Sequence, residues 1–190
     1  MSFAIEKISD DVVNRLHQLV KFYKEELIKI YNDFINELER GVDVEDYVKQ
    51  VKEVEQRMRE EATLLPLDAV VKFLEDMAAE TKTEVGQVLE GVKNLEREAC
   101  KRGNAELVLV SLAFSNLTNG LSWFILLLAF ESLRRGRVEV ADRLVRSVYN
   151  QSLEEVIKRW CGFVKAAEIW ERSFPRVAIE DVVCIRRGTC

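Results

Sequence analysis

Turn-forming residues are scarce in this chain, with only two prolines and eight glycines among 190 residues. Sheet-rich architectures need a turn every few residues, so this scarcity indicates long helices. Hydrophobic residues make up 48% of the sequence, which is enough to build a core in a chain of one-domain length. We therefore predict an all-α fold, an antiparallel bundle of about five long helices around an apolar central helix, with a single domain over residues 1–175 and a short extended tail over 176–190.

Residue types that carry out chemistry are also rare. His17 is the only histidine, and the phosphate-loop, dinucleotide-binding, serine-nucleophile and HExxH zinc motifs are all missing. His17 lies one residue off the seam of the first expected helix, which favours an exposed flank position over a catalytic base. The sequence therefore predicts a non-enzymatic protein with no catalytic, cofactor-binding or metal site.

The four cysteines, Cys100, Cys161, Cys184 and Cys190, lack the paired spacing of a zinc site. The N-terminus has no secretory signal pattern, so we expect an intracellular, cytoplasmic location and free thiols, with Cys161 as a small core residue. The composition is rich in Glu, Lys and Arg, as in thermophiles. In a hyperthermophile, intracellular disulfides occur, and the candidate pairs are then Cys184 with Cys190 or Cys100 with Cys161.

Apolar spacing and capping residues set the expected helix boundaries. The first helix should carry a heptad-like seam that includes Tyr23, Leu27 and Phe34. The last should bury Trp160, Phe163 and Trp170 on its apolar stripe. The expected helices span residues 9–41, 43–65, 66–102, 105–135 and 138–175, the third divisible at Thr81–Glu84 and the fifth broken at Asn150–Ser152. Asp43 should start the second helix, Gly103 should end the third, and Ser152 with Glu155 offers a capping box at the break in the fifth.

The fourth expected helix contains 24 consecutive uncharged residues, 107–130. This length would span a bilayer, so a single-span membrane protein is one alternative. Its small polar residues favour a buried central helix instead, because most of them fall on one face of a continuous helix, where they allow close packing or line a channel for a ligand. These residues are Ser111, Ser115, Asn116, Thr118, Asn119 and Ser122.

Two further features concern partners. The tail contains a β-favouring run, Val182, Val183 and Ile185, with no strand partner except residues 3–5, which suggests self-association. Residues 1–100 carry 14 basic and 23 acidic side chains, whereas residues 101–190 carry 14 basic and 10 acidic. This asymmetry suits head-to-tail contact between copies or a basic surface for an acidic partner.

The basic half provides candidate nucleic-acid contacts. They are Arg134, Arg135, Arg137, Arg143, Arg146, Lys158 and Arg159. No base-stacking platform is expected beside them, because the nearby aromatic residues fall on the core stripe. Our leading hypothesis is a structural, assembly or protein-interaction module that is a subunit of a homo-oligomer or larger complex. The alternatives are a helical nucleic-acid-associated subunit, as in a nucleoprotein complex or viral nucleocapsid, and the single-span membrane protein.

Overall fold

The computed structural model describes residues 10–62, 85–117 and 119–173, and every element in these ranges is an α-helix. The predicted all-α class is therefore confirmed, although the chain forms more and shorter helices than five. The helices are α1 (Asp10–Glu37), α2 (Val44–Ala62), α4 (Val85–Arg102), α5 (Ala105–Ser115), α6 (Ser122–Arg134), α7 (Val138–Tyr149) and α8 (Leu153–Ser173). The tail over 176–190 and the first part of the third expected helix lie outside the described residues.

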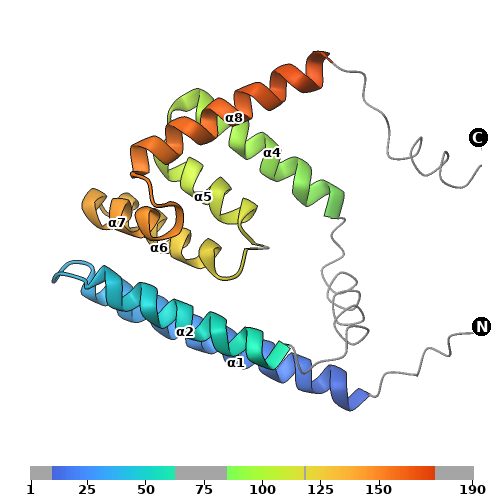
Figure 1. Ribbon diagram of the computed structural model, residues 1–190, viewed down its shortest axis with the longest axis vertical. Helices are drawn as coiled ribbons and strands as arrows, with labels where there is room; N and C mark the ends of the chain where they lie inside the picture. Colours follow the sequence, from blue (N-terminus) through green and yellow to red (C-terminus); the bar gives the residue numbers. More distant parts are fainter. Residues whose placement is uncertain (1–9, 63–84, 118, 174–190) are drawn as a thin grey trace, which may run out of the picture.

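The helices form three groups (Figure 1). The antiparallel hairpin of α1 and α2 lies on one side of the molecule, and α4 and α8 lie on the opposite side, with α5, α6 and α7 between them. Helix α6 packs against both α5 and α7, and the α1–α2 hairpin rests on α6 and α7. Among the described residues, neither α1 nor α2 contacts α4 or α8.

Local capping signals explain several of the helix ends. The Asp43 side chain accepts hydrogen bonds from the first turn of α2, at 3.1 and 3.3 Å. At the start of α8, the backbone N–H of Ser152 donates to Glu155, and the backbone N–H of Glu155 donates back to the Ser152 hydroxyl, which forms the expected capping box. Gly103 follows α4 with a φ of +62°, a conformation that glycine adopts without strain. The expected break at Asn150–Ser152 is confirmed.

The uncharged segment does not form the single long helix that we predicted. It forms a hairpin of α5 and α6, and the expected seam of polar residues is broken up in the turn between them. Asn116 ends α5, and its side-chain amide donates to the carbonyl of Leu112 and the hydroxyl of Tyr149, at 2.8 and 2.7 Å. Gly120 turns the chain with a φ of +55°. Two short helices can cover each other's apolar faces, which a straight helix cannot do for itself.

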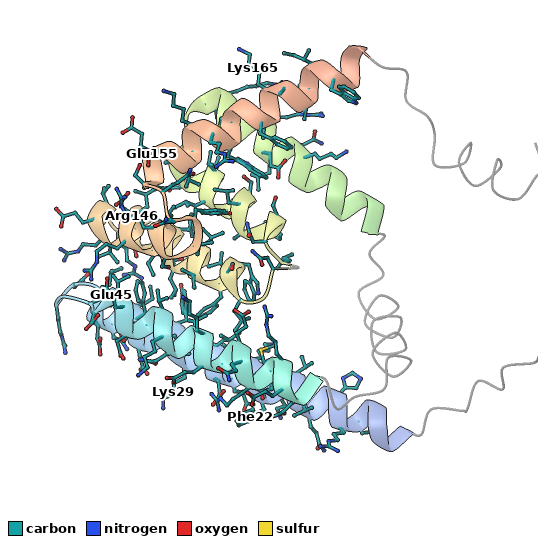
Figure 2. The ribbon with its side chains drawn as sticks, in the orientation of Figure 1. Phe22, Lys29, Glu45, Arg146, Glu155 and Lys165 are labelled. Atoms are coloured by element: carbon teal, nitrogen blue, oxygen red, sulfur yellow. A yellow bond between two sulfur atoms is a disulfide. The ribbon has the colours of Figure 1, made fainter. Side chains whose placement is uncertain are left out.

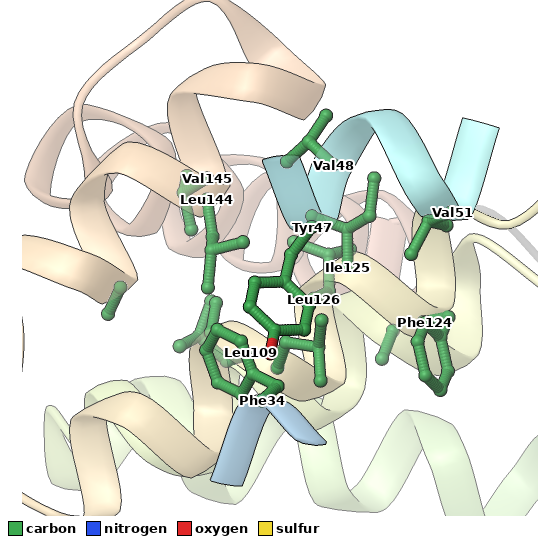
Figure 3. Packing of buried hydrophobic residues seen from close by; sticks show 14 of the residues in the cluster. Phe34, Tyr47, Val48, Val51, Leu109, Phe124, Ile125, Leu126, Leu144 and Val145 are labelled. Atoms are coloured by element: carbon green, nitrogen blue, oxygen red, sulfur yellow. The ribbon is translucent and has the colours of Figure 1, made fainter. Parts of the chain in front are cut away.

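The core lies where the α1–α2 hairpin meets the central helices (Figure 3). Phe34 of α1 is fully buried and meets Tyr47 of α2 edge to face, with ring centroids 5.2 Å apart. Leu109, Leu126 and Leu144 are also fully buried, one each from α5, α6 and α7. The uncharged segment is thus largely enclosed by its neighbours, as predicted, even though it is folded in two.

Candidate interaction surfaces

Most of the basic residues that the sequence suggested for nucleic-acid contact are held by other groups of the protein. Arg137 donates to the Glu39 carbonyl at 3.2 Å. The ion pairs are Arg134–Glu131 (2.9 Å), Arg135–Glu131 (3.7 Å), Arg146–Asp142 (2.6 Å) and Arg143–Glu45. Within the described residues, Lys158 and Arg159 make no ion pair. A phosphate backbone would have to compete with these pairs for five of the seven candidates.

One of these ion pairs joins two separate parts of the fold. Arg143 of α7 meets Glu45 of α2, residues 98 positions apart in the sequence. Figure 2 shows Glu45 and Arg146 on the same side of the molecule, where the α1–α2 hairpin meets α7. The pair joins the hairpin to α7, but both side chains are exposed, at 47% and 71%, so it contributes about 1 kcal/mol or less to stability.

A disulfide links Cys100 of α4 to Cys161 of α8, with a Cα–Cα distance of 5.4 Å. This is one of the two pairs that the sequence suggested, and the expectation of free thiols is wrong for these two residues. It also corrects the prediction that Cys161 is a plain core residue. Cys184 and Cys190, the other candidate pair, lie outside the described residues, as do Val182, Val183 and Ile185. The bond fixes α8 to α4 on the side of the molecule opposite the α1–α2 hairpin.

The outer part of α8 is exposed, contrary to the predicted core stripe. Val164 is buried, but Phe163, Trp170 and Ile169 are 66%, 63% and 58% exposed. Helix α8 is covered by α4, α5 and α7 mainly over its first half. Phe163 and Trp170 are seven residues apart and therefore share a helical face. We call the exposed apolar surface formed by Phe163 and Trp170 the α8 face; Ile169 lies on another side of the helix.

A second apolar surface is a groove between α1, α2 and the α5–α6 hairpin. Its volume is about 700 Å³, within the range of roughly 300–1,000 Å³ seen for ligand pockets. The floor consists of buried side chains that include Tyr23, Leu27, Leu121 and Phe124. The rim carries three exposed apolar side chains, Val20 (43%), Ile28 (48%) and Leu117 (55%). We call this feature the α1–α2 groove.

The wall of the α1–α2 groove is fixed by Glu55 of α2. Its carboxylate accepts a hydrogen bond from the backbone N–H of Leu121 at 3.2 Å and pairs with Arg59 at 2.6 Å. The carboxylate lies so close to Gly120 that an added Cβ would come within 2.2 Å of it. A side chain at residue 120 would therefore have to displace the Glu55 carboxylate, which receives the α5–α6 turn. The sequence signal that we missed is the Asn119–Gly120 dipeptide, a common turn former.

Two tyrosines contribute hydroxyl groups to the α1–α2 groove. Tyr23 is 4% exposed and its hydroxyl has no partner at hydrogen-bonding geometry. Burial, together with the nearby Glu61 carboxylate, raises the pKa of Tyr23 to about 12. Burial and Glu131 likewise raise the pKa of Tyr31. Both hydroxyls therefore stay protonated, and the carboxylates beside them belong to the rim of the groove and the end of α6.

Among residues 10–62, 85–117 and 119–173, no three His, Cys, Asp or Glu side chains cluster as metal ligands. His17 is exposed on α1, as predicted. Within the same part of the chain, no helix combines the length and the apolar character needed to cross a membrane.

No family model, curated protein or solved structure matches this chain. The helices of the α1–α2 hairpin, which line the groove, and helix α8 lie on opposite sides of the molecule (Figure 1).

Proposed function

We propose that this chain is a non-enzymatic assembly module that associates with further copies of itself through its exposed apolar surfaces. The observation that carries the proposal is the α1–α2 groove, whose rim exposes Val20, Ile28 and Leu117 to solvent. Large apolar side chains gathered around an open groove are typical of surfaces that bind another protein. Single apolar residues scattered over a surface are common and do not indicate a binding site.

The many apolar side chains that line the groove favour a protein partner over a small polar ligand. Glu55 and Arg59 already pair with each other, so they offer few unsatisfied polar atoms to a ligand. Small-molecule sites usually combine an apolar lining with several polar groups that converge on the ligand. A helical segment with apolar side chains needs no such groups, because its own backbone hydrogen bonds are internal.

Light scattering of the full chain over a wide range of concentration tests the proposal. We expect the apparent mass to rise above that of a monomer as the concentration increases, and to change little with added salt, because the contact is mainly apolar. A chain that stays monomeric throughout would refute the proposal. A salt-dependent shift of an oligonucleotide, abolished by replacing Arg143 and Arg146 with Ala, would instead favour the nucleic-acid alternative.

A further inference from the structure

We propose that the floor of the α1–α2 groove binds a neutral apolar molecule that carries a hydroxyl group, such as a long-chain alcohol. The observation that carries this inference is Tyr23, which lines the groove and whose buried hydroxyl has no hydrogen-bond partner among the described residues. The inference goes beyond the proposed self-association, which concerns the exposed rim of the groove, and does not depend on it.

The unpartnered hydroxyl of Tyr23 calls for a partner from outside the chain. The side chain is only 4% exposed, so bulk water does not reach the hydroxyl. Buried polar groups are nearly always hydrogen-bonded, because a buried group without a partner loses its bonds to water and gains nothing in return. Since burial raises the pKa of Tyr23 to about 12, the hydroxyl stays protonated and is a donor. An oxygen atom of a ligand in the groove would accept this hydrogen bond.

An acceptor lies next to this donor. The Glu61 carboxylate also lines the groove and is close enough to contribute to the raised pKa of Tyr23, although no hydrogen bond of ordinary geometry joins the two side chains. A ligand hydroxyl both accepts and donates, so it would bridge Tyr23 and Glu61. An ether or carbonyl oxygen can only accept, and a ligand carboxylate would be repelled by Glu61.

The charges of the lining favour a neutral ligand. Four of the lining residues are charged, and the two basic ones balance the two acidic ones, Lys24 and Arg59 against Glu55 and Glu61. Arg59 and Glu55 already pair with each other at 2.6 Å. A charged head group would meet like charge as well as opposite charge, and it would lose its hydration on entering an apolar groove.

The rest of the lining suits an extended apolar chain. Tyr23 and Tyr31 both line the groove, and α1 rises about 12 Å between them at 1.5 Å per residue. This length is close to that of extended n-decanol, so a chain whose hydroxyl meets Tyr23 can run along α1 toward Tyr31. The side chains that would cover it include Leu27, Met58, Leu121, Trp123 and Phe124.

Calorimetric titration of the full chain with n-octanol and n-decanol tests the inference, on protein dilute enough to suppress association. We expect saturable binding that is about fourfold tighter for each added methylene, the factor expected for burying one such group. Tyr23→Phe removes only the hydroxyl, so it should weaken n-decanol binding by about five- to tenfold, as the loss of a hydrogen bond does.

Two matched controls isolate the Tyr23 hydroxyl. Tyr31 also lines the groove, but its hydroxyl lies beside Glu131, whose carboxylate already pairs with Arg134 and Arg135. Tyr31→Phe should therefore bind n-decanol like the wild type. Dipentyl ether is an isomer of n-decanol with an oxygen that cannot donate to Glu61, so it should bind the wild type more weakly than n-decanol does.

Trp123 can locate the bound alcohol, because its side chain lines the groove. In a Trp160→Phe, Trp170→Phe background it is the sole tryptophan of the chain. Its emission should move to shorter wavelength as n-decanol displaces water from the groove. Circular dichroism should show equal helix content in all variants.

The outcomes separate this inference from the proposed function. An absence of saturable binding, or equal n-decanol affinities for the wild type and Tyr23→Phe, would overturn the inference. Equal affinities for n-decanol and dipentyl ether would also overturn it, because a hydroxyl would then not be recognised. These results leave the self-association standing, since that proposal is tested by the mass of the protein alone. A chain that binds n-decanol as expected but stays monomeric at every concentration would support the inference and refute the self-association.

Discussion

Removing the Cys100–Cys161 disulfide should lower the free energy of unfolding by about 4 kcal/mol. The two cysteines are 61 residues apart in the sequence, so the bond closes a long loop that includes α5, α6 and α7. Loop-closure entropy predicts roughly 3 kcal/mol for a 15-residue loop and 4.7 kcal/mol for a 100-residue loop, which brackets this case. The bond constrains the unfolded chain, and this is where most of its effect should arise.

Other contacts between α4 and α8 are too weak to replace the bond. The Arg97–Glu168 ion pair is 3.5 Å long with both side chains partly exposed, at 26% and 22%. Pairs of this kind contribute about 1 kcal/mol or less. Trp160 packs between the two helices, but its buried indole N–H has no hydrogen-bond partner, which offsets part of the gain from burying the ring.

Urea unfolding followed by circular dichroism measures the effect. The background should be a Cys184→Ser, Cys190→Ser variant, so that Cys100 and Cys161 are the only thiols. We compare its oxidised form, its reduced form and a further variant with Cys100→Ala and Cys161→Ala. With a slope near 2 kcal/mol per molar urea, the midpoint should fall by roughly 2 M on reduction.

The comparison also separates the contribution of the covalent bond from that of the cysteine side chains. Equal midpoints for the oxidised and reduced forms would refute the loop-closure argument outright. A loss seen only in the alanine variant, and not on reduction, would show that the cysteine side chains contribute through packing, and that the covalent bond itself contributes little.

Three further predictions test the turn, the α7–α8 junction and the tyrosines. Gly120→Ala should destabilise the fold by about 2 kcal/mol, because φ is +55° there and the new Cβ would displace Glu55 from the Leu121 N–H. The control is Gly136→Ala, where φ is +74° but the space around the residue is open. Equal losses of stability at both sites in urea unfolding would contradict the clash. Asp142 accepts the Leu153 N–H at 2.7 Å, and this bond, with Arg146, lowers the pKa of Asp142. Asp142→Asn should therefore lower the free energy of unfolding by about 1 kcal/mol at neutral pH. This difference should vanish as the pH falls from the usual pKa of 3.8 through the lowered pKa of the folded state, and a constant difference between variant and wild type in acid would contradict the reasoning. Burial raises the pKa of all four tyrosines, that of Tyr23 to about 12, so the unfolded chain releases these protons first and stability should decline above pH 10. Ultraviolet titration of the folded protein should show little phenolate at pH 10. A titration midpoint near 10 in a protein with native circular dichroism would be inconsistent with burial.

The sequence alone determined the features that depend on neighbours a few residues away. The Asp43 cap, the Ser152–Glu155 box and the stop at Gly103 were all predicted, because each is a hydrogen bond or backbone preference within one helical turn. The α1 seam was predicted for the same reason, since Tyr23, Leu27 and Phe34 fall on one face by spacing alone and are buried.

The tertiary structure decided which apolar faces are covered. The periodicity of apolar residues predicts that Phe163 and Trp170 share a face of α8. It cannot predict that α4, α5 and α7 cover mainly the first half of that helix. Spacing also could not choose the Cys100–Cys161 pair, because four cysteines allow three pairings. The hairpin over residues 107–130 makes a contact that spacing could not reveal, because Glu55, which accepts the Leu121 N–H, is 66 residues away in the sequence. Contacts between distant segments therefore set both candidate surfaces, and the chain's local preferences set only the helices that carry them.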